Sequence, residues 1–336
     1  MINDNEQHRS ASAIEDQLLA LINGTAYNDT PRSRVELQLA RMHGESVTVP
    51  SPQSRIEQLL EDIYKKESRG ILVKKPEIGY IVLDWDSFGY ATKVQVYGET
   101  PPADLFNKAA NPQHGKLKII YFMDGLVNIS QRICFNNDML TEVYLPSSVT
   151  TIGVSSFDGC SMANFNVREN DEWEVGKLPA KLEVIGDYAF RGIGSKLLGL
   201  PDSVKSIGKS AFEDCAWLQG SLPRSLASLS ESAFKNCERL TITEIPSGIT
   251  SIPANAFYGC IATKVVKIPA TVKTIADTAF GMCTGLTRVE FSGTPESIGV
   301  AFVGCSNITD IYVPWAEGVV ENAPWGAASA TIHYSN

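Results

Sequence analysis

The sequence has no excess of positive charge, no long apolar run and few histidines. Its 336 residues carry 29 lysines and arginines against 38 aspartates and glutamates, and this net charge of −9 argues against nucleic acid as a partner. No segment approaches the roughly 18 apolar residues of a membrane-spanning helix, so we expect no membrane insertion. The first residues, MINDNEQHRSASAIEDQ, have neither a basic region nor an apolar core and predict no Sec signal peptide.

Motifs for catalysis are also missing. We find no G-x-S-x-G, no H-E-x-x-H, no phosphate-binding loop and no dinucleotide fingerprint. The acidic pair Asp84 and Asp86 could be imagined as acid and base or as calcium ligands, but it is typical of a solvated turn. The cysteines never form C-x-x-C and the four histidines lie outside the repeats, so the sequence predicts no metal and no cofactor. We expect a protein that is not an enzyme.

What the chain has in abundance is a repeat. Phenylalanines recur at intervals of 22, 33, 22, 22, 23, 23 and 22 residues, and six of the seven cysteines follow one of them by three places. So regular a period predicts a solenoid. The marker phenylalanines are Phe135, Phe157, Phe190, Phe212, Phe234, Phe257, Phe280 and Phe302.

One unit, LPDSVKSIGKSAFEDC, shows the expected architecture. Alternating aliphatic residues indicate two short strands, and a proline ends the first strand at positions 146, 179, 201, 223, 246 and 269. The place after the second strand holds Gly208 here but Pro253 in another unit. Because proline cannot adopt a positive φ, this place is interpreted as a helix start, and the Phe-to-Cys spacing then predicts one short helical turn per coil.

The phenylalanine and cysteine of each unit are predicted to point inward, as a large wedge beside a small side chain that is easily buried. Ile193 takes the cysteine place after Phe190, which favours packing over chemistry. Coils stack about 5 Å apart, so distance alone does not exclude disulfides, but a column of thiols is the simpler expectation. The predicted core residues are Phe157, Cys160, Phe190, Phe212, Cys215, Phe234, Cys237, Phe257, Cys260, Phe280, Cys283, Phe302 and Cys305.

The unit LPxSVxSIGxxAFxxCxxLxxVxIP resembles the leucine-rich repeat of the BspA type over residues 129–314. A degenerate first copy, ISQRICFNNDMLTEVYLP, has Asp138 in the cysteine place. The resemblance implies an α/β fold: a right-handed leucine-rich-repeat solenoid of about 8 coils, built from short strands and short helical turns. It also implies an adhesion or recognition surface without a catalytic centre.

Residues 1–69 show a second period. Capping boxes of the form S-x-x-E begin at Ser12, Ser33 and Ser54, and each opens a short helix with one apolar stripe. Helices so short must bury that stripe, either against one another or against another copy or protein as an assembly module. The stripe residues assigned to assembly are Ile14, Leu18, Val35, Leu39, Ile56, Leu60 and Ile63.

Residues 70–128 and 315–336 are predicted to close the two ends of the solenoid. Alternation in GYIVLDWD, TKVQVYG and LKIIYFMDG indicates strands that lead into the first coil, where an uncovered end would expose a strand edge. At the other end, Trp315 and Trp325 are expected to cover the last coil. Exposed rings that stack on sugars are the alternative.

Two sets of residues are candidates for partner binding. The interval of 33 inserts extra residues in ANFNVRENDEWEVGK, and such insertions become loops that often lie on the binding face. Trp173 is then either a contact residue or folded back onto the coil; the predicted contacts are Arg168, Glu172, Trp173 and Glu174. The second set is a nearly unbroken hydroxyl column, either a contact surface or simply a soluble strand face. It comprises Thr151, Ser206, Ser228, Ser251, Thr274 and Ser297.

The ending FSGTPESIGVAFVGCSNITDIYVPWAEGVVENAPWGAASATIHYSN, the stretch IVLDWDSFGYATKVQVYG and PQSRIEQLL are together similar to repeat proteins encoded among the tail and structural genes of phages and prophages of Gram-positive bacteria. This resemblance implies a virion component, made in the cytoplasm, that contacts a host surface or another virion protein. A bacterial cell-surface adhesin and an intracellular scaffold are the alternatives. The expected partner is a protein or a cell-envelope glycan, with other virion proteins bound through the N-terminal segment, and the chain is a candidate homo-oligomer.

Overall fold

The structure is a computed structural model that describes residues 79–86, 88, 90–110, 114–169 and 172–335. The assembly helices expected in residues 1–69 lie outside the described residues. The first nine strands are β1 (Gly79–Trp85), β2 (Ala91–Tyr97), β3 (Ile119–Phe122), β4 (Asn128–Ile129), β5 (Glu142–Pro146), β6 (Thr151–Ile152), β7 (Asn164–Glu169), β8 (Glu172–Val175) and β9 (Val184–Ile185). The other nine are β10 (Ser206–Ile207), β11 (Ser228–Leu229), β12 (Ser251–Ile252), β13 (Val265–Ile268), β14 (Thr274–Ile275), β15 (Arg288–Phe291), β16 (Ser297–Ile298), β17 (Asp310–Val313) and β18 (Thr331–Tyr334).

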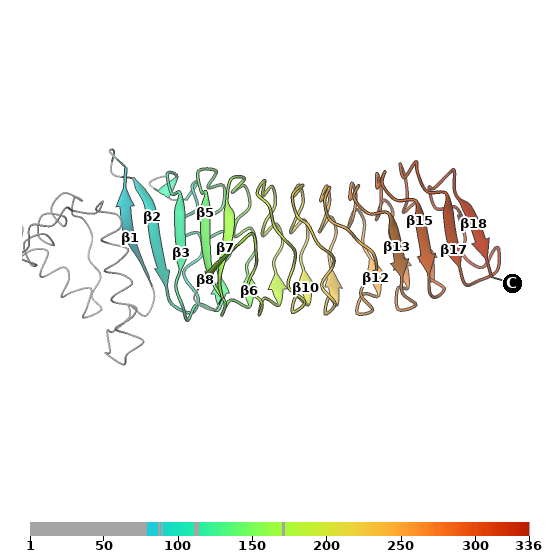
Figure 1. The fold of residues 1–336 in the computed structure, drawn as a ribbon, viewed down its shortest axis with the longest axis horizontal. Helices are drawn as coiled ribbons and strands as arrows, with labels where there is room; N and C mark the ends of the chain where they lie inside the picture. Colours follow the sequence, from blue (N-terminus) through green and yellow to red (C-terminus); the bar gives the residue numbers. More distant parts are fainter. Residues whose placement is uncertain (1–78, 87, 89, 111–113, 170–171, 336) are drawn as a thin grey trace, which may run out of the picture. The chain divides into compact units, whose positions relative to one another are not determined.

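These strands form ladders between neighbouring coils of a solenoid (Figure 1). The longer first strands make a six-stranded sheet, β1-β2-β3-β5-β7-β8, and a four-stranded sheet, β13-β15-β17-β18. The short second strands make a five-stranded sheet, β11-β10-β9-β6-β4, and a three-stranded one, β12-β14-β16. Partners one coil apart pair parallel and in register, as Ile120 does with Val143 and Val143 with Phe165. The sequence repeat therefore becomes a spatial repeat.

The expected helical turns are absent from the described residues, which contain no helix. Each phenylalanine from Phe157 to Phe280 instead sits in a tight turn with two residues at positive φ, such as Ser210 (φ 50) and Asp214 (φ 63) around Phe212. A left-handed residue interrupts a right-handed helix. The turn's N–H groups also bond to the next coil, as the Phe212 N–H does to the Ala233 carbonyl at 2.9 Å. Bonding between coils replaces the bonding within a helix that the Phe-to-Cys spacing predicted.

The phenylalanines stack into one continuous column through the core. Ring centroids of successive residues from Phe157 to Phe302 lie 5.1 to 5.9 Å apart, and the Phe212 and Phe234 rings are within 4° of parallel. All of these side chains are fully buried. Parallel stacking follows from the register, because in-register coils place identical side chains directly above one another.

The six cysteines that follow a phenylalanine by three places, together with Ile193, form a second buried column, and all seven cysteines are free thiols. Each thiol in a cysteine place donates to the carbonyl of the preceding coil's phenylalanine place; the Cys237 Sγ lies 3.1 Å from the Phe212 oxygen. Burial raises the pKa of Cys215 to about 12. The thiol is therefore protonated and donates a hydrogen bond to a buried carbonyl. This explains why a small side chain with a hydrogen-bond donor recurs at this place.

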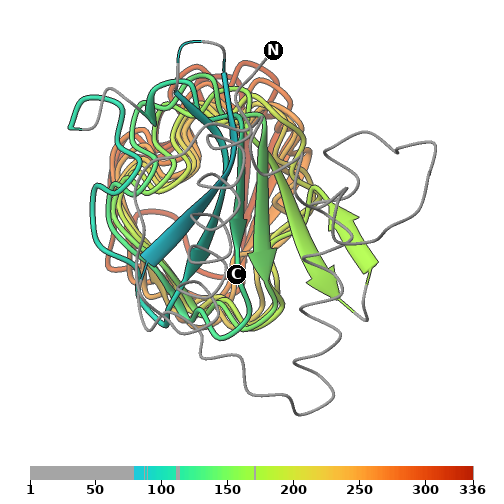
Figure 2. The ribbon, with the colours of Figure 1, turned by 90° about the vertical axis from the view of Figure 1, so that its left-hand side faces the viewer.

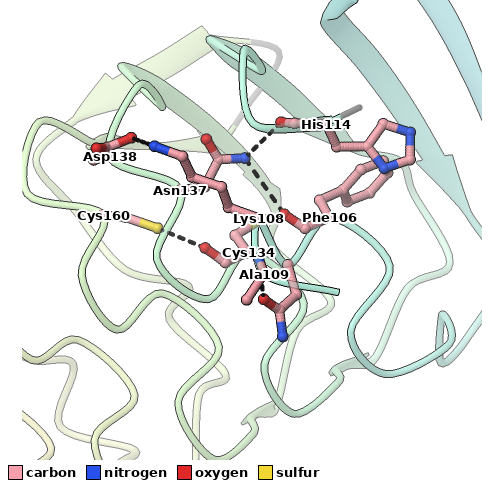
Figure 3. Close-up of polar contacts among 9 residues, drawn as sticks. Phe106, Lys108, Ala109, His114, Cys134, Asn137, Asp138 and Cys160 are labelled. Atoms are coloured by element: carbon pink, nitrogen blue, oxygen red, sulfur yellow. Dashed lines mark hydrogen bonds and ion pairs between the residues drawn. The ribbon is translucent and has the colours of Figure 1, made fainter. Parts of the chain in front are cut away.

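The first copy of the repeat is aligned one residue differently from the expectation. Cys134 holds the phenylalanine place of this coil. Its N–H bonds to the Ser156 carbonyl of the next coil, as the N–H of a phenylalanine does in the other coils. Asn137, and not Asp138, holds the cysteine place: its Nδ2 lies 3.4 Å from the Phe106 carbonyl and 3.1 Å from the His114 carbonyl (Figure 3). Asp138 instead pairs with Lys108 at 2.6 Å. The sequence pattern aligned this copy one residue too late, because Phe135 was taken as its marker phenylalanine.

The same hydrogen bonds extend the solenoid at both ends. Phe106 is fully buried and its N–H bonds to the Ile133 carbonyl, so a coil lies within the region expected only to cap. At the other end, the Phe302 N–H bonds to the Trp325 carbonyl. The solenoid therefore has about 10 turns and not 8. Trp315 and Trp325 are buried on Phe291, with centroids 5.2 and 6.0 Å away, so neither ring is exposed for sugars.

Candidate partner-binding surface

The insertion at the interval of 33 forms a hairpin and not a loop. Strands β7 and β8 pair antiparallel, with Arg168 opposite Trp173 and Val167 opposite Glu174. Glu172 begins β8. Seen along the solenoid, the hairpin extends beyond the outline that the coils share (Figure 2). The inserted residues therefore extend the six-stranded sheet by one antiparallel strand at its edge.

Trp173 combines the two alternatives that the sequence left open. Its ring folds back onto the neighbouring coil, 4.7 Å from the Tyr144 centroid and at 76° to it. It nevertheless remains 42% exposed. Tyr144 in turn stacks on Tyr121, with centroids 4.4 Å apart and planes within 8°. The three aromatic side chains form a cluster on the face of the sheet turned away from the core; we call it the aromatic cluster.

Polar side chains fix the base of the aromatic cluster. Glu142 accepts hydrogen bonds from the Nδ2 of Asn164 at 3.1 Å and of Asn166 at 2.7 Å. Burial, together with nearby Tyr121 and Glu142, raises the pKa of Tyr144 to about 12, so its hydroxyl stays neutral. Val175 lies opposite Asn166 at the edge of the sheet and is 63% exposed. Two exposed apolar side chains, Trp173 and Val175, thus lie on strand β8 beside this hydrogen-bonded group.

Charge around the hairpin is mainly negative. Residues 168–174 contain Arg168 against Glu169, Asp171, Glu172 and Glu174. Glu174 forms an ion pair with Lys177. Exposed pairs of this kind contribute little to stability. The sequence of this segment is therefore acidic on balance, with four carboxylates and one guanidinium.

The hydroxyl column lies in other sheets and is divided. Ser206 pairs with Ser228, and Ser251 with Thr274, but no ladder joins β11 to β12. Pro253 accounts for one missing bond: at its place in the preceding coil the Ser230 N–H bonds to the Ile207 carbonyl at 3.1 Å, and proline has no N–H. The structure therefore does not bring the hydroxyls and Trp173 into one surface.

The sequence-based analysis missed Tyr121 and Tyr144. They occupy matched positions in the ladder, 23 residues apart, directly opposite each other in the register. A column-by-column comparison extended upstream of residue 129 would have paired them. The spacing could not have shown that Trp173 completes the cluster, because that depends on the hairpin turning back over the sheet.

Two kinds of feature are absent from the described residues. No group of three or more His, Cys, Asp or Glu side chains is arranged to hold a metal. No helix there has the length and apolarity that a bilayer crossing requires.

A model of the BspA type leucine rich repeat region matches residues 113–173, 172–242 and 218–322. The chain belongs to the BspA-type leucine-rich-repeat family. Repeat families of this kind use their extended surfaces for binding. No protein with a curated description matches the chain in sequence.

Solved structures share the fold. A leucine-rich repeat protein from Bacteroides ovatus is 19% identical over 79% of this chain and 76% of its own, with a TM-score of 0.51. The pneumococcal vaccine antigen PcpA is 18% identical over 73% of this chain and 68% of its own, with a TM-score of 0.47. A leucine rich cell surface protein from Faecalibacterium prausnitzii is 16% identical over 78% and 94%, with a TM-score of 0.38. At these identities the likeness concerns the fold alone.

Proposed function

We propose that this BspA-type protein is a recognition protein without catalytic activity, and that it contacts its partner through the hairpin β7–β8 and the aromatic cluster. The observation that carries the proposal is Trp173, which is 42% exposed although it rests on a tyrosine pair fixed from below. Aromatic side chains held rigidly at a surface are the usual energetic centres of interfaces. Elsewhere the coils repeat one pattern, whereas this hairpin departs from it.

Photo-crosslinking tests the location of the contact. A photoreactive amino acid at position 175 should capture the partner, and the capture should be lost with Trp173→Leu. The same amino acid at position 261, where the native Ile261 is 41% exposed in a turn remote in sequence, serves as the control and should capture nothing. Equal capture at both positions, or capture that Trp173→Leu leaves unchanged, would contradict the proposed surface.

We further propose a phage particle as the working location, with the host surface or another virion protein as the partner. The free, buried thiols support it, because such a column suits a protein that folds in the reducing cytoplasm. Mass spectrometry of purified particles should detect the intact chain. Surface labelling of the chain on cells that lack a prophage would point instead to a cell-surface adhesin.

The assembly role of residues 1–69 stays a prediction. If their helices join copies of the chain or bind other virion proteins, the full chain should have a larger oligomeric mass than a chain that begins near residue 70. Light scattering after size exclusion measures both. Equal masses for the two would remove the homo-oligomer from the proposal.

A further inference from the structure

Arg239 is an exposed arginine that stacks on a ring but has no carboxylate partner. Its guanidinium lies over the Trp217 ring, 3.7 Å from the ring centroid. Among the residues that the structure describes, its side chain forms no ion pair and no hydrogen bond, and this includes the preceding residue, Glu238. Trp217 is 44% exposed, and Arg239 is exposed as well. The hydrogen-bond donors of this guanidinium are therefore unused by the described part of the chain.

Three other arginines lie over a ring, and each of them also pairs with a carboxylate of the chain. These arginines, with their rings and carboxylates, are Arg132 (Phe135, Asp104 at 3.1 Å), Arg191 (Tyr188, Asp158 at 2.9 Å) and Arg288 (Tyr312, Glu290 at 3.0 Å). Each of the three thus has its positive charge balanced by a nearby acid. Arg239 has the ring alone.

A stacked guanidinium is well suited to bind a carboxylate. Stacking on Trp217 uses the face of the planar group, whereas its five N–H donors point outward in the plane of the group. A carboxylate accepts two of these donors in parallel, and such charge-assisted bonds are about twice as strong as neutral ones. Because the ring already restrains the guanidinium, less side-chain freedom is lost when a ligand binds.

A second unpaired cation lies one coil earlier. Lys196 is exposed and precedes the fully buried Leu197, just as Trp217 precedes the fully buried Leu218. The parallel bridge between Leu197 and Leu218 places Lys196 and Trp217 at neighbouring outward positions. Within the described residues, the Lys196 ammonium forms no ion pair. Two positive side chains without partners therefore flank Trp217, one in the coil before it and one in the coil after it.

The two cations lie on the coils that follow the hairpin β7–β8. The Leu198 N–H bonds at 2.7 Å to the carbonyl of Gly176, the residue directly after β8. Leu198 is 44% exposed and Val175 is 63% exposed, so apolar side chains are exposed where the hairpin meets this segment.

The direction of the Arg239 side chain limits the extent of the site. Arg239 reaches back to Trp217 in the preceding coil, toward the hairpin. Ile261 lies in the following coil, where the Ala262 N–H bonds to the Glu238 carbonyl. The site therefore lies on the side of Arg239 that faces away from Ile261.

This combination favours a protein ligand over a charged polymer. A polymer with an anionic group on every unit would bring many negative charges against a chain of net charge −9 and would leave Leu198 uncovered. A protein segment can present one acid among apolar side chains. Arginine and tryptophan beside apolar residues are also typical of the centres of protein interfaces.

We propose that Arg239 and Lys196 bind a glutamate or aspartate side chain of a protein partner, and that Trp217 holds the guanidinium in position for it. This assignment rests on the proposed function, because the site adjoins the hairpin. It names the chemistry by which the partner is recognised.

Fluorine NMR of the full chain tests the assignment. The chain has five tryptophans, which are labelled as 5-fluorotryptophan, and the spectrum of Trp217→Phe identifies the Trp217 resonance. The probes are a nine-residue peptide of glycine and serine with one glutamate between two leucines, and the same peptide with glutamine in place of the glutamate. The glutamate peptide should shift the Trp217 resonance to saturation. The glutamine peptide should bind about tenfold more weakly, the effect of losing a hydrogen bond to a charged group.

Variants locate the binding on Arg239. Arg239→Gln removes the charge and should weaken glutamate-peptide binding about tenfold. Arg239→Lys keeps the charge without the planar fork and should fall between; it also serves as the test if the glutamine variant does not fold. Arg288→Gln is the matched control, because Arg288 also stacks on a ring but already pairs with Glu290, and it should bind as the native protein does. Thermal unfolding of each variant checks that the fold is kept.

Several results would overturn the acid site: no binding of the glutamate peptide, equal affinity for both peptides, or unchanged binding by Arg239→Gln. Binding of soluble polyphosphate that Arg239→Gln abolishes, without binding of the glutamate peptide, would overturn the protein ligand in favour of a phosphate polymer. If crosslinking from position 175 still depends on Trp173 in these cases, the hairpin contact stands and only the acid site is wrong.

Discussion

Replacing Asn137 with cysteine should make the protein more stable. Asn137 occupies the thiol place of its coil and is fully buried, with its Oδ1 lacking any hydrogen-bond partner among the described residues. In the regular coils the thiol donates to the preceding coil over 2.9 to 3.3 Å and brings no second polar atom into the core. The change Asn137→Cys keeps a donor for the Phe106 carbonyl and removes the unpartnered oxygen.

Asn137→Cys changes the free energy of unfolding in two opposing ways. Removing an unsatisfied buried acceptor relieves about 1–3 kcal/mol, whereas losing the Asn137 bond to the His114 carbonyl costs about 1 kcal/mol. That carbonyl is not left unpartnered, because the Leu117 N–H also bonds to it at 3.0 Å. We therefore expect a net stabilisation of about 1 kcal/mol, which in a domain of this size raises the melting temperature by about 2–4 °C.

Thermal unfolding followed by circular dichroism measures the effect. The reverse substitution in a regular coil, Cys237→Asn, is the matched control and should lower the melting temperature, because it places the same orphaned oxygen among fully buried neighbours. A melting temperature for Asn137→Cys below that of the native protein, with Cys237→Asn behaving as expected, would refute the reasoning. It would mean that the Asn137 oxygen has a partner, such as an ordered water.

Three further outcomes follow from the packing. Phe234→Ala should lower the free energy of unfolding by about 3–5 kcal/mol in a denaturant titration, because it opens a cavity in the ring column; a loss under 1 kcal/mol would contradict continuous packing. Cys215 in the native protein should resist a thiol reagent at pH 8. Burial raises the pKa of this thiol from 9.0 to about 12, so the thiol ionises at lower pH in the unfolded chain than in the folded one. The free energy of unfolding should therefore fall between pH 9 and about 12, and melting temperatures across that range measure the fall. Pro253→Ser should slow amide exchange at Ser251 by restoring the N–H that the β11–β12 ladder lacks; unchanged exchange would exclude proline as the cause of the break.

The period of the sequence by itself determines the solenoid. Intervals of 22 or 23 residues fix the length of a coil, and a side chain such as Phe212 that recurs at that interval must meet its equivalents in adjacent coils. The inward direction of the cysteines also follows from local sequence, since Ile193 can replace one of them. Each of these conclusions depends only on repetition, which the amino-acid sequence shows directly.

Local conformation and the candidate binding surface depended on the tertiary structure. The Phe-to-Cys offset is equally compatible with a helical turn and with a turn containing two left-handed residues, and the hydrogen bonds from Phe212 to the next coil decide between them. The sequence likewise placed Trp173 in an insertion but could not show that Tyr144 and Tyr121 lie beneath it. Those contacts join coils and a hairpin whose relation is set by pairing across the sheet, and pairing between segments far apart in sequence is not encoded in any one of them.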